Sequence, residues 1–331
     1  MSGKRKYLSE FSVTITSERW LMFTPEQLHA EGVMRAEHKD IADNCHIYMI
    51  CKRPKATCSS EPPIIDNGIM TGFLTSRVDG KELISSYKLP FQFEDEEEKI
   101  VVAEYPHRKI YTVNNQGEGV RYWPGDFLAF HTGNRIFKDL EVLYIGQAYA
   151  EGKRTALDRL RSHSTLQKIL ADTMYNFPDD QVFIIAVEYD DYFIASMFNR
   201  MEEGVISGEE DDIRLKSVFE NPLSQKEIIC LSEAGLIRYF KPKYNKIYRD
   251  NFPAADQSVL SGCFDLDFSG LSVEIELYDT GLRLFSDSAS AQHHHIAMFN
   301  LVDETERLGF FTFSDGVNAP FTVDGTILMK K

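Results

Sequence analysis

Long apolar runs are absent from this sequence of 331 residues. No stretch approaches the ~18 consecutive apolar residues of a membrane-spanning helix, so we expect no such helix. The first residues include basic side chains but no apolar run behind them, which is not the pattern of a secretory signal. These two absences predict a cytoplasmic protein that makes no contact with a membrane.

Paired cysteines are lacking as well. The sequence contains five cysteines, an odd number, and no C-x-x-C motif. Cys51 and Cys58 are separated by six residues, a spacing that matches no zinc-binding pattern. We therefore expect reduced thiols, as in a cytoplasmic protein.

Positive charge is scarce, because 36 Lys and Arg residues oppose 51 Asp and Glu residues and give a net charge of −15. A protein that neutralises phosphates needs Lys and Arg where the nucleic-acid backbone lies, so this total argues against a general nucleic-acid binder. Binding depends on local patches, however, and the distribution of charge therefore matters more than the sum.

The residues that are present indicate a folded chain with several parts. Hydrophobic residues make up 43% and charged residues 26%, which is close to globular averages. The chain is too long for one average domain, and its 23 Phe and 15 Tyr favour β-rich packing. We expect an α+β fold in three parts: a β-rich or mixed N-terminal domain (1–120), a central domain (121–253) and a β-rich C-terminal region (254–331).

Apolar runs and charge runs predict the elements of these parts. The expected strands are 45–51, 69–74, 100–103, 127–130, 142–145 and 182–187. The acidic run 94–98 predicts a solvated loop. Residues 188–221, which contain ten acidic and three basic side chains, predict an acidic insertion with helical pieces.

Two helices are expected in the central domain. Residues 153–171 have an apolar stripe at helical spacing, although Ser164 and Thr165 can interrupt it. Residues 225–240 predict a second helix that stops at Pro242, because proline cannot donate the next backbone hydrogen bond.

The central domain places reactive side chains at the end of one strand and on both helices. A Tyr-Ile-Gly sequence that begins at Tyr144 ends its strand. Arg159 and His163 are four residues apart and share one face of the next helix. Glu233 lies on the second helix, and Asn245 follows that helix within Lys-Pro-Lys-Tyr-Asn.

In order and spacing these residues resemble the GIY-YIG nucleases. That family has a Tyr-Ile-Gly strand end, a helix with Arg and often His four residues later, a Glu on a later helix and an Asn after it. The resemblance covers residues 126–245 and implies a small central sheet flanked by helices. It also implies a metal-dependent endonuclease whose catalytic residues are Tyr144, Arg159, His163, Glu233 and Asn245.

The implied chemistry suits these residue types. Glu233 would hold Mg²⁺ or Mn²⁺, because hard cations prefer carboxylate oxygens. Arg159 would donate its planar fork to phosphate oxygens. Tyr144 would act as general base or orient the water, which requires a nearby cation because its usual pKa is about 10. His163 would relay a proton, and Asn245 would hold the helix end or contact the phosphate.

Two local segments have the basic charge that the whole chain lacks. Residues 152–168 and 236–250 each contain five basic side chains and one acidic side chain. We expect a nucleic-acid substrate, DNA in the first instance, and by analogy a role in phage defence or restriction. The flanking regions would serve a partner protein or a homo-oligomer. The expected substrate-binding residues are Gly146, Lys153, Arg154, Arg161 and Lys243.

One departure from the family pattern supports a second hypothesis. The family's first strand, Gly-Ile-Tyr, contributes a tyrosine to the site, whereas the strand at 127–130 has none. Tyr122 and His131 lie on either side of it. The alternative is therefore a catalytically impaired module that binds nucleic acid or a partner protein.

Two other patterns indicate no site. The segment from Gly146 to Thr155 differs from a phosphate-binding loop, because five residues separate its glycines and Arg154 replaces the required Ser or Thr. The histidines at 293–295 predict a solvated loop, since adjacent residues on a strand face opposite sides and cannot easily share one metal.

Overall fold

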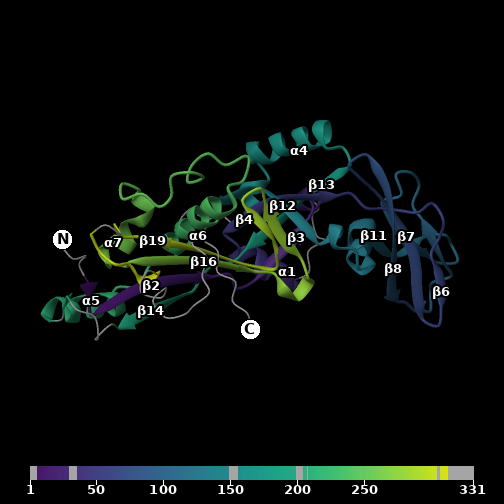
Figure 1. The fold of residues 1–331 in the computed structure, drawn as a ribbon. Coiled ribbons are helices and arrows are strands. Elements are labelled where there is room, and N and C mark those ends of the chain that lie inside the picture. Colours follow the sequence, from purple (N-terminus) through teal and green to yellow (C-terminus); the bar gives the residue numbers. More distant parts are fainter. Residues whose placement is uncertain are drawn as a thin grey trace. The chain divides into compact units, whose positions relative to one another are not determined.

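The computed structural model describes residues 6–29, 36–148, 156–198, 204–206, 208–303 and 306–311, and these combine helices with several small sheets (Figure 1). The α+β class expected from the sequence is therefore correct. Two compact units are present: the first comprises Met1–Cys51, Glu141–Gln167 and Phe183–Lys331, and the second comprises Lys52–Leu140 and Lys168–Val182. These two units differ from the three parts expected from the sequence, because residues of all three parts belong to the first unit.

A six-stranded sheet contains the strands that matter most for the site. Its order is β18–β17–β12–β4–β13–β3. The predicted strands at 45–51, 142–145 and 182–187 are confirmed as β4, β12 and β13, and β4 and β13 are almost wholly apolar and buried, as interior strands require. The bounds are β3 Trp20–Phe23, β4 Ile47–Pro54, β12 Asp139–Gln147, β13 Asp180–Val187, β17 Arg283–Ser286 and β18 Ala289–Gln292.

A second sheet of the first unit joins distant parts of the sequence, in the order β14–β2–β16–β19. β2 (Ser9–Thr16) and β16 (Gly270–Glu276) are parallel, whereas β14 (Tyr192–Phe198) and β19 (His294–Asn300) pair antiparallel at the edges. The acidic segment 188–221 thus contains a strand of this sheet besides the expected helix α5 (Glu209–Glu220).

Helix α6 (Gln225–Phe240) has the predicted bounds and packs against β16 and β19 (Figure 1). A capping box starts it: the Ser224 amide donates to Glu227 Oε2 at 2.8 Å, and the Glu227 amide donates to Ser224 Oγ at 3.4 Å. A Cβ at Gly235 would lie 2.7 Å from Val273 Cγ2, so the glycine allows the helix to approach β16 closely.

The helix predicted over 153–171 is two helices, α3 (Ala156–Leu160) and α4 (Ser164–Asn176). The predicted interruption at Ser164 is confirmed, and His163 lies in the break. Residues 153–155, and with them Lys153 and Arg154, lie outside the described part of the chain.

The second unit is built from hairpins. β7 (Ile69–Val78) and β8 (Lys81–Pro90) are joined by Asp79 and Gly80, whose φ angles of 49° and 73° suit an Asp-Gly hairpin turn. Its core includes Met70, Leu74 and Tyr87. The predicted strands at 69–74 and 100–103 are confirmed as β7 and β9. The other strands are β5 Thr57–Cys58, β6 Ile64–Asp66, β9 Lys99–Val102, β10 Lys109–Val113 and β11 Gly119–Pro124.

Two local predictions were wrong, and a third was right for all but one residue. Residues 127–130 are helical, in α2 (Gly125–Ala129) and the 3₁₀ turn η2 (Phe130–Thr132), because a four-residue apolar run cannot by itself distinguish a strand from a buried helix. The acidic run 94–98 is the predicted loop, and four of its five residues are exposed. The exception is Glu97, which is 8% exposed and is ion-paired with Arg121, which holds its pKa down to about 2.

The second error concerns the histidines at 293–295, of which two belong to strand β19 rather than to a solvated loop. His295 is 2% exposed and lies 3.1 Å from the Tyr239 hydroxyl through Nδ1. His294 faces the other side of the sheet, where Nε2 pairs with Glu274. The alternation of faces along a strand, which the sequence argument used against a shared metal site, therefore separates these two rings.

Short elements complete the described chain: β1 Lys6–Tyr7, β15 Val205–Ile206, η1 Pro25–His29, α1 Ala36–Asn44, η3 Arg135–Phe137, η4 Ser258–Leu260, α7 Ser261–Asp265 and η5 Tyr278–Thr280. In the described part of the chain, no helix has both the length and the apolar character needed to cross a membrane.

Candidate functional site

Two tyrosines from adjacent strands meet one histidine in the first unit. Tyr48 lies on β4 and Tyr144 on β12, and their ring centroids are 6.2 Å apart. The His163 ring centroid lies 5.5 Å from that of Tyr48 and 5.4 Å from that of Tyr144. Tyr48 is 1% exposed, whereas Tyr144 is only partly buried. Tyr144 is therefore the tyrosine of this pair that solvent can reach.

Gly146 is needed for the close approach of these rings. A Cβ at this position would lie 2.6 Å from the Tyr48 Oη and 2.8 Å from Tyr144 Cε1. Such separations are shorter than van der Waals contact, so the rings could not keep their places beside an alanine. The glycine of the Tyr-Ile-Gly sequence therefore serves packing between the two strands.

The buried His163 is held through both ring nitrogens. Its Nδ1 accepts the Leu166 amide at 3.2 Å in the first turn of α4, and its Nε2 lies 3.1 Å from the Tyr48 Oη. Burial, with the charge of Arg159, lowers the His163 pKa. A neutral ring that accepts at Nδ1 has its proton on Nε2, so Nε2–H donates to Tyr48.

The two tyrosine hydroxyls interact with each other and with Arg159. Burial raises the pKa of both. A hydrogen bond from Arg159 lowers the pKa of Tyr48, and one from Tyr48 lowers that of Tyr144. Tyr48 therefore receives donors from His163 and Arg159 and directs its own proton to Tyr144. These donors oppose the effect of burial, which still leaves the pKa of both hydroxyls above its ordinary value.

Arg159 and Arg161 have different surroundings. Arg159 is exposed on α3, and its charge lowers the pKa of Tyr48, Tyr144 and Glu233. Arg161 donates through Nε to the Leu28 carbonyl at 3.2 Å. Arg159 therefore acts electrostatically on the tyrosine pair.

Glu233 lies on α6 and is partly buried. Burial raises its pKa to about 7, against hydrogen bonds from Gln147 and the charge of Arg159. Its own charge raises the pKa of Tyr144 and Tyr48. The carboxylate is thus electrostatically coupled to both tyrosines and to Arg159.

The Asn245 side chain has a structural role, because both of its polar atoms are hydrogen-bonded to the backbone. Its Oδ1 accepts the Ile145 amide at 2.9 Å, and its Nδ2 donates to the Ile145 carbonyl at 2.8 Å. The side chain is buried. It fixes the chain after α6 to the strand of Tyr144, so it does not contact a phosphate through these atoms.

The remaining predicted residue, Lys243, is exposed and has its Nζ 5.7 Å from the Tyr244 ring centroid. The structure thus places Tyr144, Gly146 and His163 close together. The charges of Arg159 and Glu233 act on the tyrosine hydroxyls of this group. Asn245 supports them through the backbone.

Tyr48 is the site residue that the sequence argument missed. It belongs to the predicted strand 45–51, but that strand had been assigned to the N-terminal domain. The tyrosine was sought at 127–130 instead, where the sequence indicated the corresponding strand. The sequence signal for this tyrosine is His46-Ile47-Tyr48, a few residues before the first segment of the second unit, which begins at Lys52.

Comparison with known proteins gives no assignment: the chain matches no protein-family model, no curated protein and no solved structure. Among the described residues, three metal-ligating side chains come close enough to share an ion in one group, which is formed by Glu274, Glu276 and His294 and does not include Glu233.

Proposed function

We propose that the protein is a metal-dependent nuclease of the GIY-YIG type that hydrolyses phosphodiester bonds in nucleic acid, with DNA as the first substrate to test. The main support is the cluster of Tyr48, Tyr144 and His163, on whose hydroxyls Arg159 and Glu233 act. Tyr48 follows His-Ile on the strand beside the Tyr-Ile-Gly strand, which is where the resemblance requires a tyrosine. The alternative of a catalytically impaired module was based on a missing tyrosine in the first strand, and Tyr48 removes that argument.

In this proposal the tyrosine pair takes the proton of the attacking water. Tyr144 is the member that water reaches, and in its ionised form, to which the Tyr48 hydroxyl donates, its oxygen accepts the proton of the water. The His163 N–H and the Arg159 guanidinium donate to the Tyr48 oxygen, and so strengthen the hydrogen bond by which Tyr48 stabilises the charge on Tyr144. His163 then serves as a fixed donor rather than the proton relay expected from the sequence.

Arg159 has a second task at the phosphate. Its exposed guanidinium can donate two parallel hydrogen bonds to phosphate oxygens and stabilise the charge that develops on them. Lysine offers a point charge without this geometry, so Arg159→Lys would replace it poorly.

Glu233 would hold the divalent cation. A partly buried carboxylate with a pKa of about 7 is stabilised by a bound cation, and a single protein carboxylate is typical of Mg²⁺ sites that retain water and phosphate ligands. Such a cation would polarise the phosphate and stabilise the leaving oxygen. Gln147 orients the carboxylate through its hydrogen bonds.

The test is cleavage of double- and single-stranded DNA and of RNA by the full chain with Mg²⁺ or Mn²⁺. Glu233→Ala and Arg159→Ala should abolish cutting, while the matched surface variants Glu98→Ala and Arg135→Ala should cut like the parent. Equal cutting by all four variants would refute the proposal. Binding of nucleic acid without cutting under either metal would favour the impaired-module alternative.

A further inference from the structure

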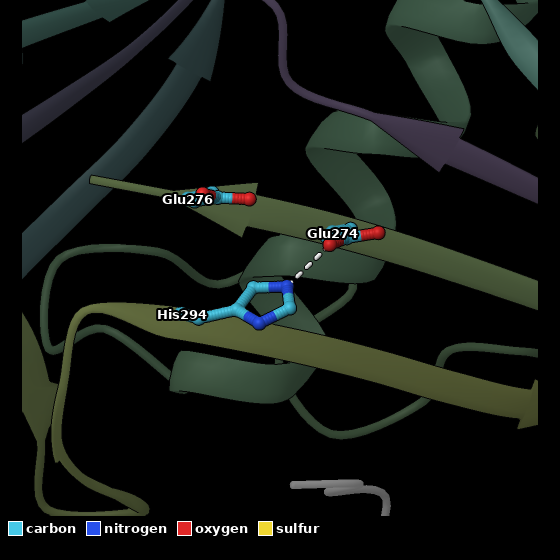
Figure 2. Close-up of side chains that lie close together, drawn as sticks. All are labelled: Glu274, Glu276 and His294. Carbon is cyan, nitrogen blue, oxygen red and sulfur yellow. Dashed lines mark hydrogen bonds and ion pairs between the residues drawn. The ribbon is translucent and has the colours of Figure 1, made fainter. Parts of the chain in front are cut away.

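We propose a second divalent-metal site, formed by Glu274, Glu276 and His294 on the four-stranded sheet, which binds a transition-metal ion such as Zn²⁺ (Figure 2). It is independent of the proposed nuclease function and of Glu233. The three ligand atoms lie within 4.8 Å of one another.

Strand geometry brings the three side chains to one face. Glu276 is directly opposite His294 in the antiparallel register of β16 and β19. Glu274 is two residues from Glu276 along β16, so both carboxylates project from the same side of the sheet. Figure 2 shows the imidazole reaching across from β19 towards Glu274, to which its Nε2 is ion-paired.

The charge of this group is not balanced by nearby cations. The imidazole of His294 is ion-paired with Glu274 alone, and in the described part of the chain neither carboxylate has an ion pair with Lys or Arg. The Glu276 side chain is exposed and has no hydrogen bond within the same residues. A dication would neutralise the charge of both carboxylates and bind Glu276 as a ligand. With three protein ligands, one coordination position would remain open for water.

The donor set favours a transition metal over the hard cations. Mg²⁺ and Ca²⁺ prefer oxygen ligands throughout, whereas an imidazole with carboxylates suits Zn²⁺ and its neighbours in the series. Ligands bound at about 2.0–2.2 Å lie about 3–4 Å apart. The three ligand atoms, which lie within 4.8 Å of one another, would adjust to that range when an ion binds.

The other face of the same strands identifies what the ion would stabilise. Val273 of β16 lies under Gly235 of α6, and His295 of β19 contacts Tyr239 of that helix. An ion that joins β16 to β19 would therefore stabilise the strand pair on which α6 rests. The predicted readout is greater thermal stability of the whole chain.

The experiment uses the full chain with Glu233→Ala, so that the proposed catalytic carboxylate cannot contribute. Zn²⁺ titration by calorimetry should show one site, and Zn²⁺ should raise the Tm by several degrees where Mg²⁺ does not. Adding Glu276→Gln or His294→Gln should weaken Zn²⁺ binding by more than the ~10-fold that is typical for loss of an outer-shell partner. Adding His293→Gln, on the neighbouring residue, should leave it unchanged.

Unaltered Zn²⁺ affinity in both Glu276→Gln and His294→Gln would overturn the proposal, as would equal loss in His293→Gln. A Tm rise with Mg²⁺ alone would overturn the assignment to a transition metal. Because every variant contains Glu233→Ala, failure here says nothing against the nuclease proposal, which is tested separately by cleavage.

Discussion

The Tyr48 hydroxyl lies 3.1 Å from His163 Nε2, and the opposite nitrogen of that ring accepts a backbone amide at 3.2 Å. The backbone therefore selects the tautomer of the histidine, and the histidine in turn orients the tyrosine proton. The strand of Tyr48 and the start of α4 are thus linked through one ring.

Tyr48→Phe should remove the acceptor of both His163 and Arg159 with little change in packing volume. In the proposed nuclease the cleavage rate would fall by about 100-fold or more, because the tyrosine pair could no longer hold the negative charge. Single-turnover cleavage measures this effect. Tyr175→Phe, at a residue that is 86% exposed, is the matched control and should cut normally.

Glu233→Gln should stabilise the fold in alkaline solution. The folded pKa of Glu233 is raised to about 7 by burial, so folding disfavours the ionised form. The resulting penalty is absent below the unfolded pKa and is fully present above pH 7, where the variant should gain about 1–3 kcal/mol. Urea unfolding at pH 4 and pH 8 without divalent ions tests the sign. A gain at pH 4 that vanishes at pH 8 would contradict it.

Gly146→Ala should harm both stability and cleavage. The added methyl group would meet the rings of Tyr48 and Tyr144 at less than van der Waals distance, and overpacking of this kind costs about 1–3 kcal/mol. Thermal unfolding gives the stability change. A variant as stable and as active as the parent would show that the two rings do not need their present separation.

Asn245→Asp should be more damaging than its small change in volume suggests. A carboxylate can accept the Ile145 amide but cannot donate to the Ile145 carbonyl, which becomes an unpaired buried acceptor. Such an acceptor costs about 1–3 kcal/mol. Denaturant unfolding should detect the loss at neutral pH. A partial recovery is expected in acid, where the protonated carboxyl can donate again.

The sequence predicted local elements well where the pattern was long. Helix α6 was correct because its apolar residues continue over four turns and Pro242 stops it, and β12 and β13 were correct because their apolar runs are bounded by polar segments. The run at 127–130 was too short to separate a strand from a helix.

Pairing between distant segments could not be predicted from periodicity. Tyr48 and Tyr144 lie on neighbouring strands, but Lys52–Leu140 of the second unit intervenes between them. The burial of Glu97 likewise depends on Arg121, which no local pattern connects to it. Spacing within the central region found Tyr144, Arg159, His163 and Glu233, whereas Tyr48 required the order of strands in the sheet.

The parallel pairing of β2 with β16 has a consequence for the timing of synthesis. The Phe11 carbonyl accepts the Ser269 amide at 2.9 Å, and Ser12 lies opposite Gly270. On the ribosome, β2 therefore emerges early and must wait for β16 before its second edge is covered. At about 5–20 residues per second this delay lasts some tens of seconds, during which a strand with an open edge is a target for chaperones and for association with other nascent chains.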